Sequence, residues 1–172
     1  MKTITADEID TVNKQINIEE TRKKQFKTLF FIEIWERYAF YSFQCIFMLY
    51  IAHLNFSSQK AYLIFGIFSA ILYIAPTLGG RIADQLLGHH RSLIIGALIF
   101  SLGYLILSYS NSENSVYIAL SIIAIGNGFF KPMPSTMISN IYNKDPAKSK
   151  SAFTYYYMAI QIGGFFAMIL SP

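Results

Sequence analysis

The sequence has few charged residues and almost no cysteine. Only 14% of its 172 residues are Asp, Glu, Lys or Arg, whereas a soluble domain carries about 25%. This scarcity of charge excludes an ordinary cytosolic enzyme and a disordered chain. The single cysteine, Cys45, cannot form an internal bridge, which excludes a disulfide-stapled secreted domain.

Sequence motifs for catalysis and for nucleotide or metal binding are missing too. The chain has no glycine-rich phosphate loop of the P-loop type and no nucleophile elbow. His53, His89 and His90 have no cysteine or carboxylate at ligand spacing, so we expect no metal site. The net charge of +4 is compatible with nucleic acid, but the positions of the basic residues favour a membrane. We therefore expect neither an enzyme nor an ATP-driven pump, and no nucleic-acid partner.

Long apolar runs fill most of the chain, which is 53% hydrophobic with a mean hydropathy of +0.38. A helix needs about 20 mostly apolar residues to cross a bilayer, whereas a membrane barrel would show an alternation of period two that is absent here. We expect an all-α membrane protein with five transmembrane helices, separated by short segments rich in Asn, Ser, Gly and Pro. The five predicted spans are roughly Leu29–Leu54, Ala61–Ile82, Ser92–Tyr109, Val116–Ile141 and Phe153–Leu170.

Lysine and arginine gather on one side of these predicted spans. The amino-terminal segment and the second and fourth breaks together hold eleven of them, whereas the first and third breaks supply only Lys60. By the positive-inside rule, the amino terminus is cytoplasmic in a multi-pass protein of the cytoplasmic (inner) membrane. We expect a cytoplasmic segment over residues 1–28 and membrane helices over 29–172. The cluster at Arg22–Lys27 is interpreted as a topology signal, with specific lipid binding as the alternative.

Three charges lie inside the first predicted span. Glu33, Glu36 and Arg37 are spaced i, i+3 and i+4, so they share one helical face. Charges within a span are costly and by default mark function. A cation beside two carboxylates favours their ionised form, while repulsion and burial favour a bound proton, so the group suits proton coupling. The alternative is that the span begins near Ala39 and leaves the three in water.

Lys131 favours the intramembrane interpretation. It lies on the order of 15 Å from the inner end of its span, at a depth that matches Arg37. A lone ammonium at this depth is expensive, so a carboxylate of the first span is its expected partner. Pro132 and Pro134 follow it, and they predict a break in the helix beside a cavity. A snorkelling lysine on a kinked helix is the alternative.

Four segments resemble motifs of the proton-dependent oligopeptide transporter family, within the major facilitator superfamily. Together they cover the chain from about Glu33 to Gly163. They are Glu33–Ser42, similar to ExxERFxYYG; Gly79–Gly88, similar to GGxxADxxxG; Gly126–Pro132, similar to GxGxxKP; and Phe153–Gly163, similar to FxxxYxxINxG. The sequence departs from these patterns at several positions, among them Phe40, Ser42 and Gln161.

The resemblance implies two six-helix bundles around a central cavity, which take up di- and tripeptides together with protons and use no other cofactor. This chain would be the amino-terminal part of such a bundle. The resemblance assigns proton coupling to Glu33, Glu36, Arg37 and Lys131. It assigns peptide binding to Arg37, Tyr41, Tyr73, Lys131 and Gln161.

Asp84 is predicted to have a gating and structural role. It ends the second span within reach of loop cations such as Arg91 and of helix ends whose partial charges favour an acid. A solvated loop acid is the alternative.

Two other functions remain open at this stage. The chain could belong to a carrier of another small solute. It could also be a truncated, non-transporting remnant or an interaction protein, because Pro172 closes the fifth span and a carboxy-terminal half would be missing.

Overall fold

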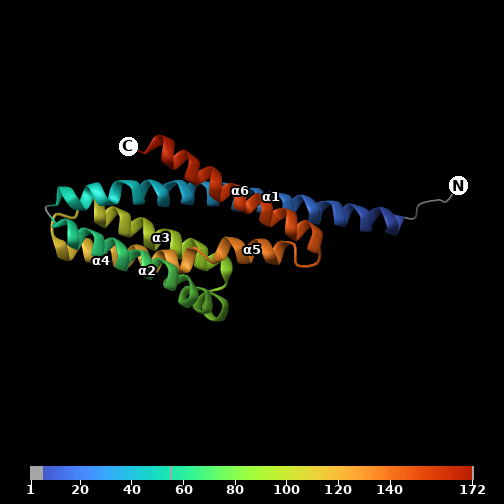
Figure 1. The fold of residues 1–172 in the computed structure, drawn as a ribbon. Coiled ribbons are helices and arrows are strands. Elements are labelled where there is room, and N and C mark those ends of the chain that lie inside the picture. The colour runs from blue at the N-terminus through green and yellow to red at the C-terminus, as the bar shows by residue number, and fades with distance from the viewer. Residues whose placement is uncertain (1–5, 55, 172) are drawn as a thin grey trace.

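A computed structural model describes residues 6–54 and 56–171, so the first five residues of the predicted cytoplasmic segment and Pro172 lie outside it. Within these ranges the regular structure is helical throughout (Figure 1). The prediction of an all-α fold is confirmed. The elements are α1 (Ala6–His53), α2 (Ser58–Ile82), η1 (Ala83–Leu87), α3 (His89–Ser108), α4 (Glu113–Phe130), α5 (Met133–Ile141) and α6 (Pro146–Leu170).

Four segments are long and apolar enough to cross a membrane, judged by length and composition: Ser58–Leu87, His89–Ser108, Glu113–Ile141 and Pro146–Leu170. They contain the second to fifth predicted spans. The first predicted span is the carboxy-terminal part of α1, and it does not meet the same standard. Its three charged residues lower its mean hydropathy, because charged side chains are costly to place inside a bilayer.

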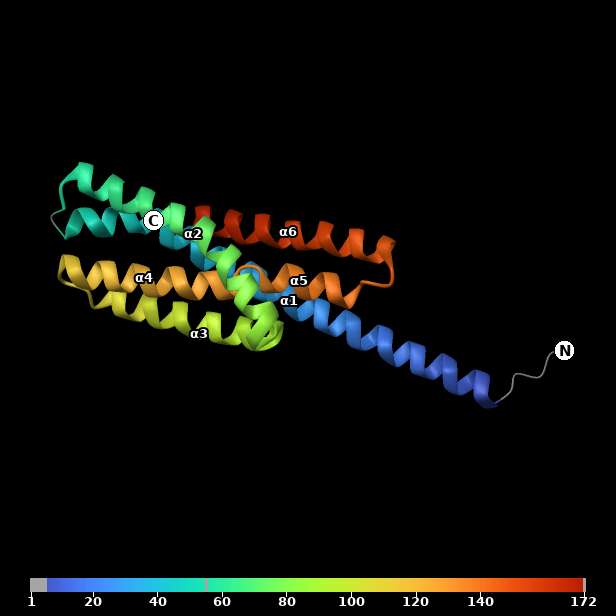
Figure 2. The ribbon, with the colours of Figure 1, turned by 90° about the horizontal axis from the view of Figure 1, so that it is seen from below.

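The predicted cytoplasmic segment and the first span form one helix. Nothing in residues 20–40 is a proline or a glycine, so no helix breaker separates the polar part from the apolar part. The first turns of α1 project beyond the other helices (Figures 1 and 2). The polar part of α1 thus continues the axis of the apolar part.

The helices form a bundle in which α4 packs antiparallel on α3 and parallel to α2, while α6 packs parallel to α1 (Figures 1 and 2). The start of α2 and the α3–α4 turn lie at one end of the bundle (Figure 1). Here Lys60 Nζ lies 2.5 Å from Glu113 Oε2, and the hydroxyl of Tyr50 lies 2.7 Å from the carbonyl oxygen of Leu107. The α5–α6 turn lies at the end where α1 projects.

Helix ends follow the capping rules that the polar breaks predicted. The Ser57 hydroxyl accepts from the Lys60 amide at the start of α2, and Ser112 and Ser115 form a reciprocal capping box at the start of α4. Gly88 has a φ of 75°, a conformation that L side chains rarely adopt, and it separates η1 from α3.

The fourth predicted span is divided in two. α4 ends at Phe130 and α5 begins at Met133, so the break falls at Lys131 and Pro132. A proline lacks the amide hydrogen that would continue the ladder, and its ring clashes with the preceding turn. The break that Pro132 and Pro134 predicted is therefore present, and it places the half-buried Lys131 at a turn within the span.

Close backbone contact joins α2 to α4 next to this break. A Cβ atom added to Gly79 would lie 2.2 Å from the carbonyl oxygen of Gly128. The two helices can approach this closely only because both positions are glycine. This contact fixes the position of Lys131 along the axis of α2, the helix that carries Tyr73.

Candidate functional site

The three charged residues of the first predicted span form one buried cluster on α1. Arg37 Nε lies 3.2 Å from Glu33 Oε1 and 2.5 Å from Glu36 Oε2. Each of the three side chains is at most 8% exposed. Their spacing places them on one face, as the sequence predicted, and the face points into the bundle rather than outward.

This cluster carries an excess of one negative charge when both carboxylates are ionised. One guanidinium serves two carboxylates, and in a buried setting an uncompensated charge is costly. Binding one proton removes the excess, and releasing it restores the uncompensated negative charge. The chemistry of this arrangement therefore suits the binding and release of a proton.

Lys131 lies beside the cluster but does not join it. Its ammonium is 5.0 Å from the ring centre of Tyr73 and 5.8 Å from that of Phe40. Within residues 6–54 and 56–171, Glu33 and Glu36 form ion pairs with Arg37 and not with Lys131. The expected carboxylate partner of Lys131 is thus already occupied, and aromatic faces take its place.

Phe40 connects the two cations. The guanidinium carbon of Arg37 lies 5.1 Å from its ring centre, and Lys131 lies on the same ring at 5.8 Å. A phenylalanine between two cations attracts both through the negative faces of its π-system and keeps them apart. The sequence marks Phe40 as a departure from a motif tyrosine, and its position three residues after Arg37 also places it beside the charged face.

Helix α6 closes the cluster from the other side. A Cβ added to Gly163 would lie 2.5 Å from the carbonyl oxygen of Ile34 and 2.7 Å from Arg37 Cβ. The absence of a side chain therefore lets α6 lie directly against the cluster. Tyr156 of α6 is 7% exposed and belongs to the buried core that also contains Leu29 of α1.

The remaining predicted peptide-binding residues differ in exposure. Tyr73 is 78% exposed, and Gln161 is also exposed. Tyr41 is half-buried, and its ring lies 3.2 Å from the position of a Cβ added to Gly164. The rings of Tyr73 and Phe40 both contact Lys131, whereas Gln161 lies on another helix, α6. Their role in binding stays a prediction.

Asp84 lies in η1, at the end of the second span. Its Oδ1 is 3.6 Å from Nε2 of His89, the first residue of α3. In the part of the chain that the structure describes, no ion pair joins Asp84 to Arg91, which is exposed on α3. The loop partner of Asp84 is thus an imidazole. Among these residues, no group of three or more metal-ligating side chains occurs.

Comparisons with known proteins identify relatives of the chain. Residues 90–172 match the model of the POT family. The chain is 40% identical to dipeptide and tripeptide permease B of Aliivibrio fischeri and to permease A of Yersinia pestis, over 151 residues each. These matches cover 87% of this chain and 30% of each permease. The chain therefore spans about 30% of the length of the curated relatives it matches.

Solved structures show the same fold. One, from a study of substrate recognition in proton dependent oligopeptide transporters, superposes with a TM-score of 0.80 at 35% identity, covering 86% of this chain and 33% of that one. Another, of tetrameric PepTSo2, superposes with a TM-score of 0.81 at 34% identity, covering 87% of this chain and 32% of the other. The named relatives are transporters rather than enzymes.

Proposed function

Because the chain belongs to the POT family, as its four motifs indicated, we propose that it forms the amino-terminal part of a carrier for di- and tripeptides. The relatives with dipeptide and tripeptide permease in their names support this substrate class. Since the chain spans about 30% of those permeases, the rest of the cavity would come from a carboxy-terminal part.

Proton coupling is proposed for the cluster of Glu33, Glu36 and Arg37. The observation that carries the proposal is the sharing of one buried guanidinium by two buried carboxylates. A proton on either carboxylate would neutralise the cluster before the carrier changes conformation. Its release would leave the cluster charged, which couples the direction of the proton gradient to the conformational cycle.

Peptide binding is proposed for the surface beside this cluster. Lys131 is held by the rings of Tyr73 and Phe40, and in the part of the chain that the structure describes it forms no ion pair with a carboxylate. It can therefore meet the carboxylate of a peptide, with Arg37 as the second cation at the site. Tyr41, Tyr73 and Gln161 would add ring faces and polar groups that tolerate varied peptide side chains.

The chain is an integral membrane protein, as its apolar helices and its permease relatives indicate. We place it in the cytoplasmic membrane with the amino terminus inside, in contact with the lipid bilayer. The basic segment of α1 and the basic α5–α6 turn support this orientation, because they lie at the same end of the bundle (Figure 1). Asp84 and Arg91 would then lie on the cytoplasmic side, where they would act in gating.

A chimaera tests the proposed function. This chain replaces the matching segment of the Aliivibrio fischeri permease, and uptake of labelled dialanine is measured in proteoliposomes with an imposed proton gradient. The proposal expects saturable, gradient-dependent uptake that unlabelled dipeptide suppresses and free alanine does not. A chimaera that inserts normally but transports another small solute in place of dipeptides would refute the proposed substrate class.

A further inference from the structure

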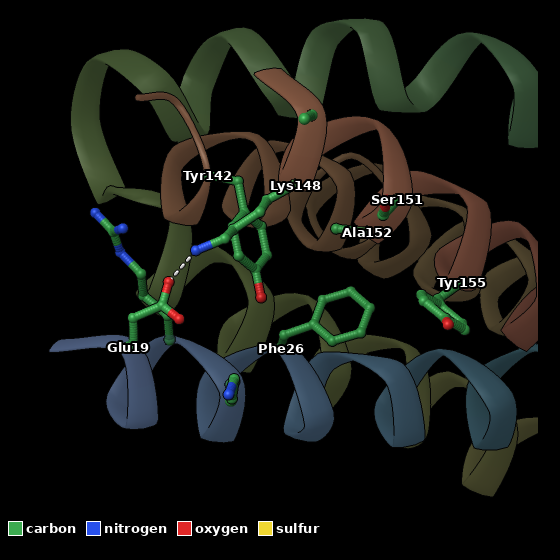
Figure 3. A pocket seen from close by; sticks show the side chains of 10 residues that line it. Glu19, Phe26, Tyr142, Lys148, Ser151, Ala152 and Tyr155 are labelled. Atoms are coloured by element: carbon green, nitrogen blue, oxygen red, sulfur yellow. Dashed lines mark hydrogen bonds and ion pairs between the residues drawn. The ribbon is translucent and has the colours of Figure 1, made fainter. Parts of the chain in front are cut away.

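A hollow of about 360 Å³ lies where the polar part of α1 meets the start of α6, and its lining residues on α1 precede Glu33 of the charged cluster by seven residues or more. Figure 3 shows Glu19 and Phe26 of α1 facing Lys148, Ser151 and Tyr155 of α6, with Tyr142 behind them. A volume of this size is within the range of small-ligand pockets. The lining residues on α1 and those on α6 are more than a hundred residues apart in the sequence.

The lining of the hollow is positively charged. Glu19 and Lys148 form an ion pair across it (Figure 3), so these two charges cancel. Arg22 and Lys23 also line it, and within residues 6–54 and 56–171 neither of them takes part in an ion pair. Two cations of the lining are therefore left for a negatively charged ligand.

The start of α6 does not supply the attraction. Its first turn is capped by Asp145, whose Oδ1 accepts a hydrogen bond of 3.1 Å from the amide of Lys148. The amide that would otherwise be free for an anion is thus satisfied within the chain. The positive character of the hollow comes from its side chains.

Aromatic rings form the remaining wall. Phe26 lies edge to face with Tyr142 at 6.1 Å and with Tyr155 at 6.5 Å between ring centres. Tyr155 is 53% exposed, so its ring is open to the surroundings. Phe26 precedes by three residues the predicted start of the first span at Leu29. The rings thus lie at the level where acyl chains meet head groups, with the cations on the side away from the bilayer.

We propose that this hollow binds an anionic phospholipid of the leaflet on the amino-terminal side. Arg22 and Lys23 would hold the phosphate, and the rings of Phe26 and Tyr155 would contact the first carbons of the acyl chains. Charge complementarity favours the anionic head group, and the aromatic wall favours a lipid over a free phosphate. The inference rests on membrane insertion and does not depend on peptide transport.

Native mass spectrometry of the chain in detergent tests the site. Phosphatidylglycerol and phosphatidylcholine with the same acyl chains are titrated separately, and we expect the first to bind on the order of tenfold more tightly. The variant Arg22→Gln/Lys23→Gln should lose this preference. The control Lys24→Gln/Lys27→Gln removes the same charge from the same helix at residues that do not line the hollow, and it should keep the preference within about twofold.

A second variant separates the hollow from charge alone. Ser151 lines the hollow and is exposed, so Ser151→Phe fills it without changing any charge and should also weaken phosphatidylglycerol binding. Circular dichroism is used to check that all variants have the same helicity before their lipid binding is compared. Equal losses in the two double variants would overturn the proposal, because the cations would then act as a diffuse field. Displacement of the lipid by an equal concentration of glycerol phosphate would overturn it in favour of a free phosphate ligand.

Discussion

Lys131 and Tyr73 form a cation–π contact, with the ammonium 5.0 Å from the ring centre. The lysine is therefore held in place by an aromatic face, while both nearby carboxylates belong to Arg37. An ammonium that is positioned but not neutralised is the arrangement that a peptide carboxylate requires. Phe40 provides the second ring that contacts Lys131.

Replacing Phe40 with leucine removes the ring that contacts both Arg37 and Lys131. Each cation–π contact is worth about 0.5–1 kcal/mol at a partly exposed site. With one ring gone, Lys131 can turn toward the carboxylates, and we expect the KM for dialanine to rise roughly five- to thirtyfold in the chimaera. Phe40→Tyr keeps the ring and should retain a KM near the parent value. Equal KM values for the leucine and tyrosine variants would show that the ring does not position Lys131.

Gly163→Ala should destabilise the bundle. The added Cβ would lie 2.5 Å from the carbonyl oxygen of Ile34, which is backbone and cannot turn aside. Overpacking of this kind costs about 1–3 kcal/mol, measurable as a lower midpoint of unfolding in mixed detergent. Gly66→Ala is the matched control, because nothing lies within 4 Å of the added atom, and alanine favours the helix by about 1 kcal/mol. The prediction fails if the two variants unfold at the same midpoint.

The contact between Glu19 and Lys148 should weaken in acid. The hydrogen bond and the charge of Lys148 lower the pKa of Glu19 below its usual range. A lowered folded-state pKa means that the contact stabilises the native state above the ordinary glutamate value of about 4.3 and is lost as the pH falls through the lowered value.

Hydrogen exchange measured by mass spectrometry on peptides around Glu19 gives the readout. The parent chain should be better protected than Glu19→Gln at pH 7, and the difference should shrink as the pH falls below the ordinary glutamate value of about 4.3. A difference in protection that stays constant through this acid range would show that the ion pair is not the cause.

Residues 1–172 on their own should insert into a membrane but carry no peptide. The relatives are about three times longer, and alternating access requires one bundle to rock against another around the site between them. Dialanine uptake into liposomes that contain only this chain is the measurement. Saturable, gradient-driven uptake would contradict the prediction and would require several copies to build the cavity.

The sequence predicts the helices well because their causes are local. Pro132 breaks the fourth span where the missing amide hydrogen requires it, and Ser57 and Ser112 cap the helices that follow the polar breaks. The shared face of Glu33 and Arg37 follows from helical spacing alone.

The partner of Lys131 could not be predicted in the same way. Two possible partners, a carboxylate and an aromatic ring, lie on the same face of α1, and spacing does not decide between them. The partner of Lys131 depends on the ion pairs that Arg37 forms with both carboxylates. It also depends on the contact between Gly79 and Gly128, which sets how close α4 comes to α2. These are tertiary contacts, and so is the approach of α6 to α1 at Gly163.

The most direct measurement of the central claim is gradient-driven uptake by the Glu36→Gln variant. Dialanine accumulation and counterflow exchange are compared in proteoliposomes that contain the chimaera, with Glu20→Gln as the control at an exposed acid of the same helix. A neutral residue at position 36 leaves Arg37 fully paired with Glu33, so no proton is needed to balance the cluster. The account predicts that accumulation is abolished while counterflow persists, and that the control accumulates normally. Undiminished uphill accumulation by Glu36→Gln would contradict it.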